Sequence, residues 1–104
     1  MPYIKKNDRS RLDRDIHELS ESIICAQSQV NDRHGLANYA ITRVLLQSLR
    51  PECGWSYSSL SSARAVFLDA LLEFDRRLMI PYENKKIKEN GDVLEYHMEY
   101  PCVM

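Results

Sequence analysis

The spacing of apolar residues along the chain predicts three amphipathic helices. Over about residues 10–30 these residues recur every three or four positions, as they do on one face of an α-helix. Similar stripes cover about 36–49 and about 60–78. The third stripe is the most hydrophobic, so we expect its helix to be central. The stripes consist of Leu12, Ile16, Leu19, Ile23, Ala26 and Val30; of Leu36, Ala40, Ile41, Val44, Leu45 and Leu49; and of Leu60, Ala63, Phe67, Ala70, Leu71, Phe74 and Leu78.

Polar residues and helix breakers mark the expected ends of these helices. Ser10-Arg11-Leu12-Asp13 has the pattern of a capping box and predicts the start of the first helix. Residues 31–35 form a polar connector that ends in a turn glycine. Pro51 stops the second helix, because the residue before a proline is pushed out of the helical conformation. Ser58 or Ser59 can cap the third helix.

The pattern changes after the third stripe. Pro81 either kinks a continuing helix or occupies the first turn of a fourth one. Residues 82–89 favour a helix, and Gly91 is a C-terminal stop. Over 93–100 apolar and polar residues alternate, which is typical of a strand with two unlike faces. A single strand is not stable alone, so it pairs with Tyr3-Ile4, pairs with another subunit, or remains an extended arm.

These patterns predict an all-α protein. We expect three amphipathic helices in a small bundle, a short kinked fourth helical segment after Pro81, and an extended C-terminal arm. Residues 1–104 are expected to form one domain, with 1–9 as an N-terminal extended segment and 93–104 as the arm. A domain of this size buries only about two thirds of the surface of its unfolded chain, so its core is thin. The thin core and the arm together predict a homo-oligomer.

Composition and charge narrow the class of protein. The chain is 44% hydrophobic and 28% charged, which is an ordinary globular composition. A net charge of −1 gives no positive field for duplex nucleic acid. The apolar runs are too short to span a membrane, and the polar stretch from Lys5 onward excludes a signal peptide. Three widely spaced cysteines, Cys25, Cys53 and Cys102, fit neither a disulfide framework nor a zinc site. We therefore expect a cytoplasmic protein without a cofactor.

No pattern of catalytic or metal-ligating residues is present in the sequence. Asp13, His17 and Glu21 are spaced four apart on the first helix, but without further ligands they are an ordinary solvated face. Cys25 lies beside an apolar stripe and is expected to be a small buried hydrophobic residue. No serine, cysteine or phosphate-loop motif occurs. The sequence therefore predicts a protein that is not an enzyme and binds no metal.

The best candidate for binding is the cationic and aromatic stretch at residues 76–88. Guanidinium and ammonium groups suit phosphate or carboxylate oxygens, and a tyrosine ring can stack on a base. The alternative interpretation is a solvated helix face with pairs such as Glu73–Arg77. Two residues of the second helix can join the stretch in three dimensions or across a subunit boundary. The candidate ligand-binding residues are Arg76, Arg77, Tyr82, Lys85 and Lys86, with Tyr39 and Arg43 from the second helix.

Three stretches resemble a family of small uncharacterised proteins of bacteriophages, prophages and bacteria. They are Met1-Pro2-Tyr3-Ile4, Asn38-Tyr39-Ala40-Ile41-Thr42, and the run PYENKKIKENGDV over 81–93, which is the most specific. The resemblance spans nearly the whole chain, which departs from the family in its longer tail after Val93. The family has no assigned activity. A phage context implies a role in host takeover, counter-defence or regulation rather than in metabolism.

Three classes of function follow from these observations. The first is a non-catalytic binding protein that sequesters a small anionic, nucleotide-like signal of bacterial immunity in a homo-oligomer, as similarity in size and helicity to small phage proteins of that type implies. The alternative is a protein-interaction module that docks on and inhibits or regulates a host or phage protein. An enzyme is the third class, and the missing motifs count against it. The expected partners are a second copy, a small anion or a host protein, but neither duplex nucleic acid nor a membrane.

Overall fold

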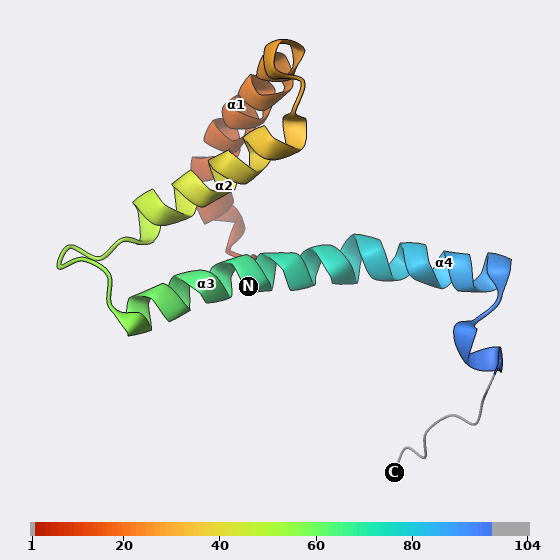
Figure 1. Cartoon of the computed structure of the whole chain (residues 1–104). Coiled ribbons are helices and arrows are strands. Elements are labelled where there is room, and N and C mark those ends of the chain that lie inside the picture. Colours follow the sequence, from red (N-terminus) through yellow and green to blue (C-terminus); the bar gives the residue numbers. More distant parts are fainter. Residues whose placement is uncertain (1, 97–104) are drawn as a thin grey trace.

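The computed structural model describes residues 2–96 of the chain and confirms the all-α class (Figure 1). No strand occurs among these residues. A hairpin of two helices is followed by a long bent helix and a short final turn. The elements are α1 (Lys6–Val30), α2 (Arg33–Leu49), α3 (Tyr57–Phe74), the π turn η1 (Asp75–Met79), α4 (Ile80–Asn90) and the 3₁₀ turn η2 (Val93–Tyr96).

Helix α1 begins before its predicted start at Ser10. The backbone amides of Asp8 and Arg9 donate to the carbonyl of Lys5 at 3.0 and 3.2 Å. Asp8 places a carboxylate in the first turn, where the helix dipole favours negative charge. Ser10, the predicted cap, lies inside the helix, and its hydroxyl donates to the Asn7 carbonyl at 3.0 Å. The predicted extended segment over 1–9 was therefore wrong from Lys6 onward.

Side-chain caps set the starts of α2 and α3. The Asp32 carboxylate accepts the amide of Gly35 at 2.8 Å. A Cβ atom at Gly35 would lie 2.1 Å from that carboxylate, so the cap requires a residue without a side chain there. Ser56 caps α3: its hydroxyl accepts the amide of Ser59 at 3.2 Å, and its own amide donates to the Ser59 hydroxyl at 2.8 Å. The cap predicted at Ser58 or Ser59 is thus Ser56.

Helix α3, η1 and α4 form one continuous bent helix, which we call the rod (Figure 1). Pro81 has no amide to donate, and its ring crowds the preceding turn. The chain widens that turn: the amide of Ile80 donates to the carbonyl of Asp75, five residues back. The rod ends at Gly91, whose φ of 88° suits glycine and whose amide donates to the Ile87 carbonyl at 2.8 Å. The kinked segment expected at Pro81 is therefore confirmed.

The strand predicted from Val93 was wrong over residues 93–96, which form the turn η2. The carboxylate of Asp92 accepts the amide of Leu94 at 3.0 Å. Such local side-chain bonds compete with an extended backbone, and no partner strand lies among the described residues. The rest of the predicted arm, 97–104, lies outside the described residues.

The described helices do not enclose a core within one chain. Helix α1 packs along α2, and α2 contacts α3, but none of the residues whose side chains are described is buried. The radius of gyration is 19.3 Å, whereas a compact domain of this length has about 13 Å. The helices expected from the sequence are thus present, with their apolar faces largely uncovered.

Candidate functional site

Tyr3, Glu73 and Arg76 tie the N-terminal segment to the rod. Arg76 holds the Glu73 carboxylate with two bonds, from Nη2 to Oε1 at 2.9 Å and from Nε to Oε2 at 3.2 Å. The Tyr3 hydroxyl donates to the same carboxylate and accepts from Arg76 Nη2 at 3.0 Å. Bidentate arginine–carboxylate pairs are among the stronger hydrogen-bonded pairs in proteins. The guanidinium of Arg76, a predicted ligand-binding group, is therefore engaged within the fold.

The sequence-based pairing of Glu73 with Arg77 was wrong, because Glu73 bonds to Arg76. Helical spacing alone allows either partner. Tyr3 decides between them, since its hydroxyl binds both Glu73 and Arg76. This contact joins residues far apart in the chain, so local spacing gave no signal for it.

The same contacts shift two ionisation equilibria. The hydrogen bond from Arg76, followed by the one from Tyr3, holds the pKa of Glu73 below its ordinary value of 4.5. The hydrogen bond to Glu73 is also the main reason that the pKa of Arg76 is raised. The contact among Tyr3, Glu73 and Arg76 therefore stabilises the charged forms of both Glu73 and Arg76.

Acidification is expected to release Tyr3 from the rod. Because the pKa of Glu73 is depressed in the folded chain, its contribution to stability is fully present above 4.5 and is lost as the pH falls through the lower, folded value. The NMR signals of Tyr3 and Ile4 should titrate in that window, and Glu73→Gln should abolish the titration. Glu18→Gln, which removes an exposed carboxylate paired with Arg14, should leave it in place. Signals of Tyr3 that stay constant below pH 4.5 until the whole chain unfolds would contradict this prediction.

The remaining cations of the candidate stretch lie exposed on the rod. Lys85 and Lys86 pair with Glu89 at 4.0 and 3.0 Å. The ammonium of Lys86 lies 5.7 Å from the centre of the Tyr82 ring. Exposed ion pairs contribute at most about 1 kcal/mol, so these side chains can exchange Glu89 for another anion at little cost. Arg77 forms no ion pair within the described part of the chain.

Tyr39 and Arg43 lie on α2, in a groove against α1. The Arg43 guanidinium donates to the Tyr39 hydroxyl at 2.6 Å and to Gln47 at 3.2 Å, and lies 5.6 Å from the centre of the Tyr39 ring. Within one chain α4 has no extensive contact with α2, so the two tyrosine–cation pairs do not share a site (Figure 1). The groove has a volume of about 340 Å³ and is lined by Leu19, Ser22, Ile23 and Ala26 of α1 and by Leu36, Tyr39, Ala40, Arg43, Val44 and Gln47 of α2.

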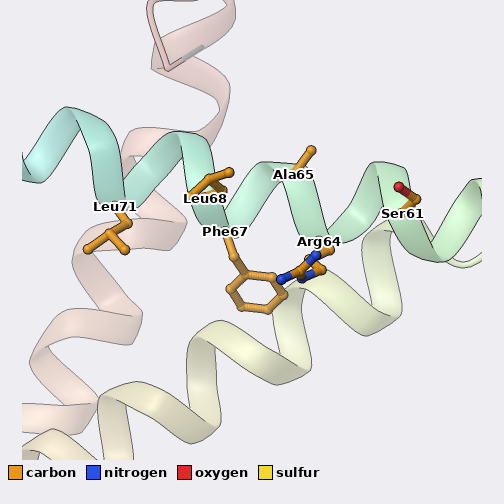
Figure 2. A pocket seen from close by; sticks show the side chains of 6 residues that line it. All are labelled: Ser61, Arg64, Ala65, Phe67, Leu68 and Leu71. Carbon is orange, nitrogen blue, oxygen red and sulfur yellow. The ribbon is translucent and has the colours of Figure 1, made fainter.

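A second concavity lies on α3 alone. Figure 2 shows the six residues that line it, with Phe67 directed toward α2 and Ala65 directed away from it. Its volume is about 460 Å³, and the lining residues are Ser61, Arg64, Ala65, Phe67, Leu68 and Leu71. The apolar stripes predicted that these faces of α1, α2 and α3 would be buried, but they did not predict that the faces stay exposed within one chain.

The described residues offer little else for chemistry. No three His, Cys, Asp or Glu side chains among them lie close enough to hold a metal ion, and Asp13, His17 and Glu21 form no such group. Cys25 is exposed, so the expectation that it is buried was wrong; the open face of α1 explains the difference. Within the part of the chain that the structure covers, no helix has the length and apolarity needed to cross a membrane.

Comparison with known proteins identifies a family without assigning an activity. No curated protein and no solved structure matches the chain. A family model described as a domain of unknown function, DUF6899, matches residues 1–93. The match ends at Val93, where the resemblance noted in the sequence also ends. The chain therefore belongs to the DUF6899 family.

Proposed function

We propose that this protein is a non-catalytic protein-interaction module that docks on a host or phage protein through the groove between α1 and α2. The observation that carries the proposal is an open, mostly apolar groove with an arginine in its wall. Monomeric proteins rarely leave large contiguous apolar surfaces exposed unless these bind something.

The groove favours an amphipathic helix with an acidic residue beside its apolar face. Leu19 and Ile23 on one wall and Leu36 and Val44 on the other supply apolar contact. A helix laid between two helices buries such residues by ridges-into-grooves packing. Arg43 forms no ion pair with a carboxylate of the described residues; its hydrogen bonds go to neutral side chains. A carboxylate on the partner would therefore complete its coordination and orient the complex.

Substitution of Arg43 by Glu is expected to weaken partner binding at least tenfold, since repulsion replaces a charge-assisted contact. At 1.4 kcal/mol per factor of ten, that loss is of the size expected for such a contact. A partner captured from host lysate would be purified and its affinity measured by titration calorimetry. Exchange of the partner's acidic residue for lysine should restore binding to the Arg43→Glu variant.

The matched control is Arg14→Glu, which makes the same change of charge on the outside of α1. The side chain of Arg14 is 84% exposed and does not line the groove, so affinity should not change. Equal binding by both variants would contradict docking in the groove. So would normal partner binding by an Ala40→Arg variant, which places a long side chain in the groove.

A small anionic, nucleotide-like ligand, sequestered for counter-defence, is the second candidate. Tyr82 and Lys86 present a ring and a charge on the same side of α4, and Lys85 adds a second ammonium. Small-ligand sites usually enclose most of the ligand surface. Helix α4 contacts little of its own chain beyond η1, so this candidate requires a second chain to close the site.

Joint substitution of Lys85 and Lys86 by Glu is expected to abolish binding of such a ligand. In thermal-shift measurements, cyclic or ADP-ribose-type nucleotides should raise the melting temperature of the wild type and leave that of the variant unchanged. The variant's own melting temperature should stay nearly unchanged, because exposed pairs contribute about 1 kcal/mol or less. No shift of the wild type with any nucleotide would count against this candidate.

A further inference from the structure

We propose that a second copy of this chain packs along an apolar stripe of the rod. Its large side chains are all at least 40% exposed, although its helix is the most hydrophobic of the chain. A helix that is apolar on most of its surface normally lies inside a core. We call this surface the α3 stripe; it consists of Leu60, Ala63, Phe67, Ala70, Leu71 and Phe74 of α3 and of Leu78 of η1.

The uncovered side chains lie where a second helix can pack. Leu71 is 55% exposed, Phe74 52% and Leu78 57%. Phe67 and Phe74 are seven residues apart within α3, and this spacing keeps apolar residues on one side of paired helices. Small Ala63 and Ala70 lie between the larger residues of the stripe, so a partner helix can approach closely.

The exposed area is large enough for an obligate contact. The chain exposes 9705 Å², whereas a compact protein of its mass exposes about 6,000 Å². Obligate homodimers bury about 2,000–5,000 Å² in total, or about 1,000–2,500 Å² from each chain. The excess of about 3,600 Å² belongs to the whole chain and is larger than what one chain contributes to such an interface.

A second copy is favoured over an unrelated protein because the cover is needed for folding itself. With none of the described side chains buried, one chain alone gains too little from apolar burial to offset the entropy lost on ordering. The surface that covers the stripe must therefore be present whenever the chain folds. A second copy of the same chain meets this condition, because every copy is made together with others. A net charge of −1 adds almost no repulsion between copies.

The concavity on α3 fits the same conclusion. All of its lining residues belong to α3, so no other helix of the described chain contributes a wall to it. Phe67 and Leu71 of the stripe are among these residues. Side chains from a second copy would supply the missing wall. This inference does not depend on docking in the α1–α2 groove, whose residues differ from those of the stripe.

Light scattering during size-exclusion chromatography tests the proposal on the full chain. The wild type should have at least twice the chain mass of 12.2 kDa at about 100 µM. Leu71→Glu should reduce the mass to that of one chain or leave the chain unfolded. Leu46→Glu is the matched control, because Leu46 of α2 is 48% exposed, does not belong to the stripe and should leave the mass unchanged.

A milder pair of variants keeps the test decisive if Leu71→Glu does not fold. Alanine preserves helix propensity, so Leu71→Ala should still associate, with its dissociation midpoint at least tenfold higher in concentration than that of Leu46→Ala. Two results would overturn the proposal: a wild type of 12.2 kDa at about 100 µM that melts cooperatively, or equal association of the two alanine variants. Neither result would bear on Arg43→Glu, so failure here is distinct from failure of groove docking.

Discussion

Dilution from about 100 µM to about 1 µM is expected to lower the melting temperature by about 5–10 °C. If folding requires a second copy, unfolding releases separate chains, and mass action favours the unfolded state at low concentration. The unfolding enthalpy of about 0.7 kcal/mol per residue sets the size of the shift. Circular dichroism at 222 nm over the concentration series measures it, because helices are the only regular secondary structure of the described residues.

The slope of melting temperature against protein concentration distinguishes stabilisation by assembly from stabilisation within one chain. Leu46→Glu should keep the wild-type slope, since the substitution lies outside the α3 stripe. Leu71→Ala should melt at a lower temperature at every concentration. A melting temperature that is independent of concentration would contradict coupled folding and association.

Substitution of Pro81 by Ala is expected to raise the free energy of unfolding by about 1–3 kcal/mol. Proline costs about 3 kcal/mol relative to alanine inside a helix. The π turn at η1 already relieves part of that cost, because it moves the Ile80 amide to the carbonyl of Asp75. Chemical denaturation of the variant at a fixed protein concentration measures the gain.

The same substitution is expected to impair binding of an anionic ligand at Tyr82 and Lys86, although it stabilises the fold. If η1 relaxes to a regular α-helix, α4 turns by up to about 100° relative to α3, the rotation of one residue. Tyr82 and Lys86 would then face a different direction from the wild type. Pro51→Ala, in the loop after α2, is the control and should not raise stability. A less stable Pro81→Ala variant would show that contacts other than proline geometry hold the π turn.

The helices were predictable from the sequence because their signals are local. Each apolar stripe repeats within one helix, and the stop at Gly91 acts within one turn. The caps were predicted less well, since several serines and acids near each start can serve. Ser10 matches the capping pattern, yet the chain begins α1 at Lys6, where Asp8 also suits the first turn.

The candidate residues were predictable in part, for the same reason. Tyr39 with Arg43 and Tyr82 with Lys86 are spaced four apart, so each pair meets on its own helix. The contact of Tyr3 with Glu73 joins residues 70 positions apart and has no local signal. An apolar stripe likewise predicts that a helix face is buried, but it does not say by which element or chain. The exposure of these faces within one chain could therefore not be predicted from the sequence.

The π turn has a consequence for how the length of this chain can vary. A single insertion or deletion inside a regular helix rotates everything beyond it and disturbs both faces at once. The segment Asp75–Met79 already carries one residue more than an α-helical turn requires. It is therefore the place on the rod where the chain can lose a residue and keep both flanking helices intact. Homologues that differ in length within the rod are expected to differ there, and their α4 faces should point in correspondingly different directions.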